Sequence, residues 1–256
     1  EWASQDLRLE ANTHLILDLF DQHRVKSTFF VLGWIADRCP GLVREIQKRG
    51  HEVASHGYGH QSCFNLSKSA LWEDLRLSKT VIEGIIGQPV LGYRAPSFSI
   101  TENVLEGLAS LGYRYDSSLN QFTLNKRNRK MNGPRKQLAN DDLMTINGVI
   151  ELPVSNLQFG AVTIPWGGGG YFRLWPVALF EWGVKRILQE KGRYVFYFHP
   201  WEIDSNQPVV KDIRWLRRFR HYLNLSQTRN RLADFFTRFE GHTFVSCSSY
   251  LNGRSD

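Results

Sequence analysis

The sequence predicts an α/β fold, specifically a deformed (β/α) barrel of seven to eight parallel strands. Short apolar runs alternate with amphipathic helical patterns along the whole chain of 256 residues, as they do in repeated right-handed βαβ units. The runs are almost continuously apolar, which is typical of parallel strands buried on both faces. Polar residues stand at the ends of four runs, and barrel enzymes build their active sites at the carboxyl ends of strands.

The predicted strands recur throughout the chain. No internal repeat and no Pro/Ser-rich linker separates them into two folding units. In chain order they span residues 27–33, 51–56, 90–96, 113–118, 149–155, 193–200 and 242–247.

Amphipathic patterns fill the intervals between the strands. Thr101 is the expected N-cap of one helix, although Val104 stands where a complete capping box has Glu. The segment WGGGGYFR, residues 166–173, is predicted to be a flexible loop with aromatic residues at both ends. The predicted helices span residues 10–23, 40–49, 67–86, 101–111, 176–190 and 228–239.

Composition excludes several classes of protein. With 42% apolar and 13% aromatic residues the chain can bury a substantial core, so it is not disordered. Three cysteines without a CxxC pair argue against a disulfide scaffold and a thiolate zinc site. The net charge of +7 would suit a polyanion or an anionic membrane. That charge is dense only at residues 125–130, without interleaved aromatics, so no nucleic-acid partner is expected.

Two histidines four residues apart, His56 and His60 in SHGYGH, can bind one metal ion as neutral imidazoles. Gly57 and Gly59 would let the backbone leave the strand and turn sharply while the ion stays accessible. The alternative is a pair of unrelated histidines in a glycine-rich turn, and the spacing alone does not separate the two.

Three further polar residues stand at predicted strand ends: Arg94, Asp116 and His199. His199 can act as a general acid or base, because imidazole titrates near neutral pH, or it can be a core histidine bonded to backbone. Arg94 is expected to have a carboxylate partner, in an active site or in a structural salt bridge. Trp166 and Tyr171 suit a sugar ring, and a plain mobile loop is the alternative there.

These motifs resemble those of the polysaccharide deacetylases of carbohydrate esterase family 4, the NodB-like deacetylases. SHGYGH is similar to their His-x-x-x-His metal motif, which implies that His56 and His60 are metal ligands. RAPSF is similar to the motif whose arginine orients the catalytic base, which gives that role to Arg94. The cofactor implied is a divalent metal ion, zinc or one like it.

The resemblance also covers the other strand ends. FYFHP is similar to the family motif of the general-acid histidine, which implies that role for His199 and a pocket wall at Phe198 or Tyr197. YDSS is a looser match, so it carries Asp116 over only as a residue of the substrate groove. Trp166, Tyr171 and Trp201 would line the same groove.

Longer stretches, including GGGGYFRL, HPWEID and RFRHYLNLSQT, are similar to the exosortase-associated subgroup found with bacterial exopolysaccharide loci. This likeness extends over almost the whole chain. It implies a deacetylase domain over residues 1–204 and a C-terminal extension, residues 205–256, packed on the same domain. A bacterial origin follows, in the cytoplasm or the periplasm, and the sequence leaves the oligomeric state open.

One departure from the family concerns its first strand, which ends in an aspartate motif that supplies the general base and a third metal ligand. This chain opens with EWASQDLRLEANT, which is similar to the segment after that strand. Asp6, Asp18 and Asp21 do not stand at a strand end. The first strand is therefore expected upstream of Glu1, and the barrel is expected to be open beside residues 27–33.

The reaction implied by the resemblance is metal-assisted hydrolysis of an N-acetyl group on a bacterial exopolysaccharide, with release of acetate. Two alternatives stay open: an allantoinase-like amidase acting on a small molecule, and a non-catalytic sugar-binding protein. No segment approaches 18 consecutive apolar residues, so no transmembrane segment is expected in this chain.

Overall fold

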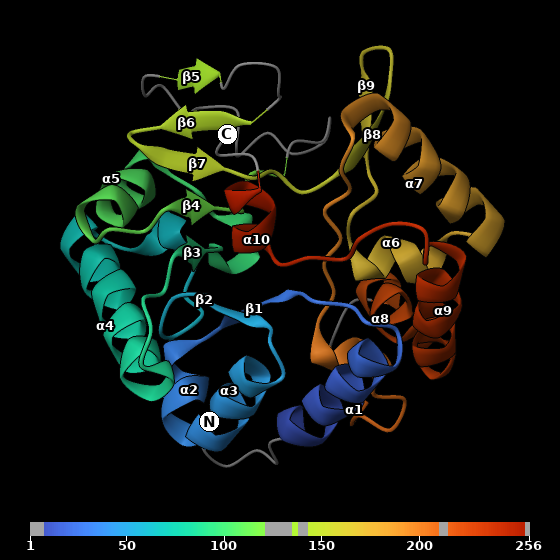
Figure 1. Ribbon diagram of the computed structural model, residues 1–256, viewed down its shortest axis with the longest axis horizontal. Helices are drawn as coiled ribbons and strands as arrows, with labels where there is room; N and C mark the ends of the chain where they lie inside the picture. The colour runs from blue at the N-terminus through green and yellow to red at the C-terminus, as the bar shows by residue number, and fades with distance from the viewer. Residues whose placement is uncertain (1–7, 121–134, 138–142, 210–214, 254–256) are drawn as a thin grey trace. The chain divides into compact units, whose positions relative to one another are not determined.

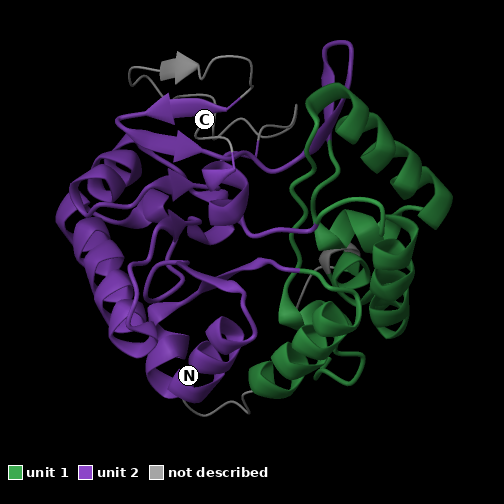
Figure 2. Ribbon diagram, in the orientation of Figure 1, with its two compact units in different colours: residues 1–25, 165–243 green, residues 26–164, 244–256 purple. Residues whose placement is uncertain are grey.

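The computed structural model describes residues 8–120, 135–137, 143–209 and 215–253 (Figure 1). The basic run at residues 125–130 and the segment before Arg8 lie outside these ranges. The chain forms two compact units, residues 1–25 with 165–243 and residues 26–164 with 244–256 (Figure 2). Each unit is described by itself.

The unit of residues 26–164 is built on a mostly parallel sheet, which confirms the predicted α/β class. Its strand order is β1-β2-β3-β4-β7-β6-β5. The first five of these strands are parallel, and β6 and β5 add an antiparallel edge. The strands are β1 (Thr28–Val31), β2 (Glu52–Ser55), β3 (Gly92–Tyr93), β4 (Tyr115–Asp116), β5 (Arg135–Gln137), β6 (Met144–Ile146) and β7 (Val149–Glu151).

Helices cover this sheet, and their ends follow from local chemistry. Ser67 caps α4 by accepting a hydrogen bond from the Ala70 amide, and Gly87 ends it in the left-handed conformation. Thr101 caps α5 by accepting from the Val104 amide, as predicted. The helices are α2 (Gly33–Arg38), α3 (Pro40–Lys48), α4 (Lys68–Ile86), α5 (Glu102–Ser110) and α10 (Cys247–Asn252), with short 3₁₀ turns η2 (Cys63–Asn65) and η3 (Pro96–Phe98).

The unit of residues 1–25 and 165–243 is helical around an aromatic core. Phe172, Phe180 and Phe235 are buried and meet edge to face, at centroid separations between 5.1 and 6.1 Å. Its elements are α1 (Leu9–Gln22), α6 (Gly169–Leu174), α7 (Val177–Lys191), η5 (Pro200–Ile203), α8 (Trp215–Tyr222) and α9 (Leu225–Arg238). Two further strands, β8 (Asn156–Phe159) and β9 (Val162–Pro165), pair with each other where the chain passes into this unit.

Five predicted strands are confirmed as β1, β2, β3, β4 and β7, but two predicted strands are wrong. Residues 193–200 make only an isolated parallel bridge, between Tyr197 and Gly168. Residues 242–247 form no strand: the Phe244 carbonyl accepts one bond from the Lys26 amide, and α10 begins at Cys247. A strand needs a ladder of such bonds, and single bonds of this kind do not form one.

The predicted flexible loop at residues 166–173 is also wrong. Gly168 pairs with Tyr197, and helix α6 begins at the next residue. A side chain at Gly168 would meet the Tyr197 hydroxyl at 2.8 Å, and one at Gly169 would meet the Glu202 carboxylate at 2.5 Å. The glycines are therefore required because other groups press against the backbone there, not because the segment is loose.

In the described sheet β1 is an edge strand. The opening expected beside residues 27–33 stays a prediction. Closure into a barrel and the boundary at residue 204 stay predictions. Across the described residues, no helix is long and apolar enough to cross a membrane.

Candidate active site

The two histidines of SHGYGH lie next to each other at the carboxyl end of β2. The His56 amide continues the pairing with β1 by donating to the Val31 carbonyl at 2.8 Å. The chain then turns at Gly57, whose φ of +75° favours glycine, and His60 also has a positive φ of +55°. This turn brings the His56 and His60 rings to a centroid separation of 5.3 Å.

Asp74 of helix α4 holds the turn through two hydrogen bonds to its backbone. Its two carboxylate oxygens accept hydrogen bonds from the Tyr58 amide at 2.9 Å and the Gly59 amide at 3.2 Å. A side chain at Gly57 would lie 2.7 Å from the same carboxylate. Gly57 is therefore needed both for the left-handed turn and for the close approach of Asp74.

The ring of His56 is fixed by the backbone of the next strand. Its Nδ1 lies 2.6 Å from the Arg94 carbonyl oxygen. A carbonyl only accepts, so Nδ1 carries the hydrogen and Nε2 keeps the lone pair that a metal ion needs. With His60 beside it, the pair fits two positions of a divalent metal site. Among the residues that the structure describes, no group of three His, Cys, Asp or Glu side chains is placed to hold a metal.

Arg94 is buried and connects β3 to the end of β4. Its guanidinium donates to the Ser117 carbonyl at 2.8 Å and to the Ser117 hydroxyl at 2.7 Å. It also lies over the Phe30 ring, 4.3 Å from the centroid. The same residue thus positions His56 through its carbonyl and the β4 end through its side chain.

Asp116 ends β4 as predicted, but it lies in the interior with no exposed surface. It accepts bonds from the Ser118 amide and hydroxyl at 3.1 and 2.6 Å, and its partner in the sheet register is Glu151 of β7. This placement gives no support to the predicted substrate contact of Asp116, since no atom of it reaches the surface.

Asp116 and Glu151 form a buried carboxyl pair, opposite each other in the register of β4 and β7. Burial raises the pKa of Glu151 well above its usual range, and the adjacent charge of Asp116 raises it further. Burial also raises the pKa of Asp116, against the hydrogen bonds from Glu151 and Ser118 and the charge of Arg94. Burial therefore favours the protonated form of this carboxyl pair.

This pair predicts an unusual pH dependence of stability. A carboxyl whose pKa is raised by folding binds its proton more tightly in the folded state. Its stabilisation is complete below the unfolded pKa of about 4.3 and is lost as the pH rises toward the folded value, by up to about 1.4 kcal/mol per pH unit. Glu151→Gln mimics the protonated form, so its melting temperature relative to wild type should rise steadily from pH 5 to 9. Thermal melts across that range measure the difference.

The matched control for that series is Glu106→Gln, since Glu106 is an exposed residue of the same unit that pairs with Lys68 at 2.6 Å. Its difference from wild type should not grow with pH. A constant difference for Glu151→Gln would show that folding does not raise the pKa of Glu151.

His199 lies in the other unit and is held by a residue three positions later. The Glu202 carboxylate accepts from both the His199 amide and its Nδ1, each at 3.0 Å. Nδ1 is therefore the protonated nitrogen, and Nε2 is left to act on a substrate. The His199 side chain is 52% exposed.

Glu202 itself is fixed by a buried ion pair. Its second carboxylate oxygen lies 2.9 Å from the Arg173 guanidinium, and both side chains are 2% exposed. Arg173 also donates to the carbonyls of His221 and Leu223 at 2.9 and 2.7 Å, which ties α6 to the end of α8. Burial alone would raise the pKa of Glu202, but the bond to His199 and the charges of His199 and Arg173 hold it below its usual range.

Three of the predicted substrate residues lie in the same unit as His199. Trp201 stacks on the rings of His199 and His221, at centroid separations of 5.7 and 4.2 Å. Phe198 packs on Phe20 and Phe196, at 6.2 and 5.7 Å. Tyr171 is half-buried in α6.

Trp166, by contrast, belongs to the core of this unit. It is 3% exposed, its indole donates to the Phe180 carbonyl at 3.0 Å, and its ring stacks on Trp175 at 5.5 Å. A ring covered on its faces offers nothing to a sugar, so this placement gives no support to Trp166 as a substrate contact.

The predicted residues thus divide between the units. His56, His60, Arg94 and Asp116 lie in one, and His199 and the aromatic residues in the other. Their convergence in one cleft stays a prediction.

The sequence did not predict the residues that hold these side chains in place, which are Asp74, Glu151, Arg173 and Glu202. Of these only Glu202 had a local signal, an acid three residues after the histidine in a helical turn.

Comparison with known proteins bears on both units. Residues 5–115 match the family model for polysaccharide deacetylases, and this match contains the His56–His60 pair and Arg94. Residues 5–115 are a polysaccharide deacetylase domain of the NodB type. Residues 126–251, which contain His199, Glu202 and Arg173, match a domain of unknown function, DUF3473.

Curated relatives of this deacetylase domain match it over less than half of the chain. A peptidoglycan-N-acetylglucosamine deacetylase from Bacillus cereus is 32% identical over 102 residues, which is 40% of this chain and 47% of that protein. A chitooligosaccharide deacetylase from Bradyrhizobium is 32% identical over 98 residues, 38% of this chain and 45% of that one. The chain therefore spans less than half the length of these relatives.

Solved structures agree on the fold over a longer stretch. A Mycobacterium smegmatis protein assigned as a polysaccharide deacetylase superposes with a TM-score of 0.61, at 23% identity, over 92% of this chain and 72% of that one. A family 4 pseudoenzyme from Bacillus anthracis superposes with a TM-score of 0.56, at 14% identity, over 94% and 60% of the two chains. At these identities the likeness concerns the fold.

Proposed function

We propose that this protein is a metal-dependent hydrolase that removes N-acetyl groups from a bacterial exopolysaccharide of the exosortase-associated kind. The observation that carries the proposal is the His56–His60 pair, with rings 5.3 Å apart and His56 Nε2 left for a metal by the bond from Nδ1 to the Arg94 carbonyl. Two curated relatives are named as deacetylases of peptidoglycan N-acetylglucosamine and of chitooligosaccharides. These names support an N-acetylated sugar polymer as the substrate.

His56 and His60 would hold the divalent ion, zinc or one like it. Bound there, the metal supplies a Lewis acid that polarises the acetyl carbonyl and activates water for attack. Arg94 keeps His56 in the metal-binding tautomer, and Asp74 keeps the turn between the histidines closed.

His199 would act on the leaving group. When the C–N bond of the acetamide breaks, the amine nitrogen needs a proton before it can depart. In the imidazolium form of His199 both ring nitrogens carry hydrogen: Nδ1 donates to Glu202, and Nε2 would give its proton to the leaving amine, which leaves the ring neutral. The products are acetate and a free amino sugar, and the new cationic amine would change how the polymer adheres to anionic surfaces.

The test is acetate release from N-acetylated polysaccharides by the full chain, after chelation and again after zinc is added back. Metal-dependent release from polymer, with little from N-acetylglucosamine monomer, supports the proposal. Release only from small amides would point to the allantoinase-like alternative. Binding of polymer without acetate release under any metal would point to a sugar-binding protein.

A further inference from the structure

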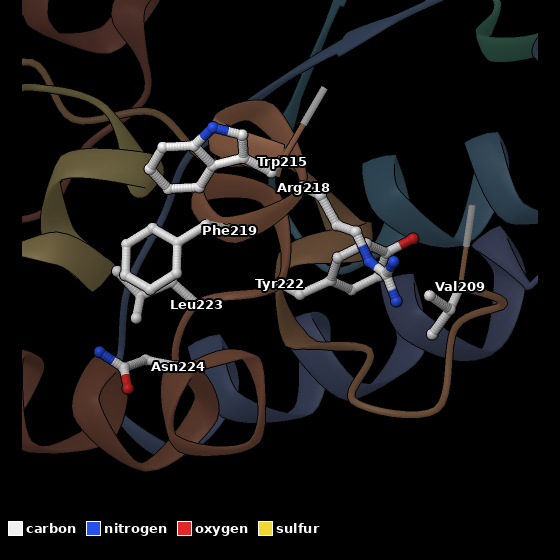
Figure 3. Close-up of a pocket in the computed structure, with 7 residues that line it drawn as sticks. All are labelled: Val209, Trp215, Arg218, Phe219, Tyr222, Leu223 and Asn224. Carbon is white, nitrogen blue, oxygen red and sulfur yellow. The ribbon is translucent and has the colours of Figure 1, made fainter. Parts of the chain in front are cut away.

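Helix α8 carries a pocket that the proposed reaction does not use. It has a volume of about 610 Å³ (Figure 3). Trp215 and Phe219, one helical turn apart, lie on one side of it in the close-up, and Arg218 and Tyr222 on the other. Its lining includes Val209, Trp215, Arg218, Phe219, Tyr222 and Leu223.

The apolar residues of this pocket are unusually exposed. Trp215 is 77% exposed, Phe219 54% and Val209 52%. Residues spaced by four on a short helix normally face a core. Here they line a hollow with space for a ligand, and a cluster of exposed aromatic rings of this kind marks a binding site.

The rings and the charge indicate which ligand fits. Indole and phenyl faces pack well against a body with apolar C–H groups and a polar rim, which describes a pyranose ring. Among the described lining residues Arg218 is the charged one, and no acid accompanies it. A guanidinium binds a planar carboxylate through paired hydrogen bonds. Together they suit a sugar that bears a carboxylate.

The pocket is connected to His199 by stacked rings. Tyr222, which lines the pocket, contacts His221 edge to face at 4.7 Å, and its hydroxyl donates to the Pro208 carbonyl at 3.0 Å. His221 stacks on Trp201 at 4.2 Å, and Trp201 stacks on His199 at 5.7 Å. The pocket is therefore only a few side chains away from the proposed proton donor, within the reach of one oligosaccharide.

We propose that the α8 pocket binds a uronic-acid residue of the polysaccharide, with the sugar ring on Trp215 and the carboxylate on Arg218, a few sugars away from the N-acetyl group at His199. This inference rests on the proposed function. It assigns the substrate to acidic polymers in which uronic acids accompany N-acetylated sugars. A membrane surface fits less well, because the apolar groups line a concavity on an eight-residue helix instead of forming a long apolar face.

The test is calorimetric binding of a hyaluronan hexasaccharide, which alternates N-acetylglucosamine with glucuronate. The same oligosaccharide after carboxyl reduction, and chitohexaose, serve as neutral probes. Trp215→Ala should weaken hyaluronan binding at least about tenfold, the loss of a stacking contact. Arg218→Gln should weaken it about tenfold and leave binding of the carboxyl-reduced probe unchanged.

The matched control is Trp182→Ala, since Trp182 of α7 is also an exposed tryptophan, at 45%, with an arginine, Arg186, near it. It should bind hyaluronan like wild type. No binding to wild type, equal binding by Trp215→Ala, or an equal loss in Trp182→Ala would overturn the inference. So would Trp215-dependent binding to phosphatidylserine vesicles without binding to any sugar.

Acetate release from the same samples separates this inference from the proposed function. If hyaluronan binding depends on Trp215 while wild type with zinc releases no acetate from any polymer, the acidic-sugar site stands and the deacetylation proposal fails. If acetate is released but binding does not depend on Trp215 or Arg218, the deacetylase stands and the acidic-sugar site fails.

Discussion

Replacing His199 by asparagine is expected to lower kcat for acetate release by about 10²–10⁴-fold, the usual contribution of a positioned general acid. His199 Nε2 would protonate the leaving amine, and asparagine has no group that can do so at neutral pH. The side chain is 52% exposed, so the substitution should leave the melting temperature almost unchanged. Steady-state kinetics on an N-acetylated polymer, with melting curves of the same samples, measure both quantities.

The control for His199 is His14→Asn, an exposed histidine on α1 in the same unit. Its kcat should equal that of wild type. Glu202→Gln keeps an acceptor for Nδ1 but loses the charge, so its loss of kcat should be smaller than that of His199→Asn. Undiminished turnover by His199→Asn would exclude His199 as the proton donor.

Replacing His56 by alanine is expected to weaken divalent metal binding by at least about 100-fold, or roughly 2.7 kcal/mol. Mutation of a residue that only hydrogen-bonds to a metal ligand typically lowers metal affinity by about 10–100-fold. His56 would itself be a ligand, so its loss should have at least the upper value of that effect. Metal-dependent acetate release should fall in parallel. Calorimetric zinc titration and the acetate assay measure the two effects.

His242→Ala is the control for that titration, because His242 is an exposed histidine outside the motif. It should bind zinc as wild type does. Unchanged affinity in His56→Ala would mean that the motif is a structural turn, held by Asp74 and the Arg94 carbonyl for packing alone.

Much of the fold follows from local sequence patterns. The apolar runs that became β1, β2, β3, β4 and β7, and the amphipathic patterns that became α1, α3, α4, α5, α7 and α9, needed no knowledge of distant residues. The same is true of the SHGYGH turn, because the spacing of its histidines and its glycines is a property of one short segment. Local periodicity and backbone freedom operate over a few residues, so the sequence displays them directly.

Other features depended on groups far apart in the chain. The run of glycines at 168 and 169 has the composition of a flexible loop. Its actual cause is the close approach of the Tyr197 ring and the Glu202 carboxylate, which leaves no space for a side chain. Residues 193–200 have the composition of a strand, but a strand exists only where a neighbour supplies a ladder, and Gly168 supplies a single bridge. Trp166 is a residue type that often contacts sugars. Here Trp175 and Phe180 pack against its ring, which makes it a core residue.

The supporting side chains of the site are the clearest case. Asp74 is 15 and 16 residues from the two amides that it holds, Glu151 is 35 residues from Asp116, and Arg173 is 29 residues from Glu202. A motif can name the groups that carry chemistry, because their spacing is local. The partners that orient the His199 ring, close the His56 turn and raise the pKa of Glu151 are determined by burial and by contacts across the fold, which no single segment contains.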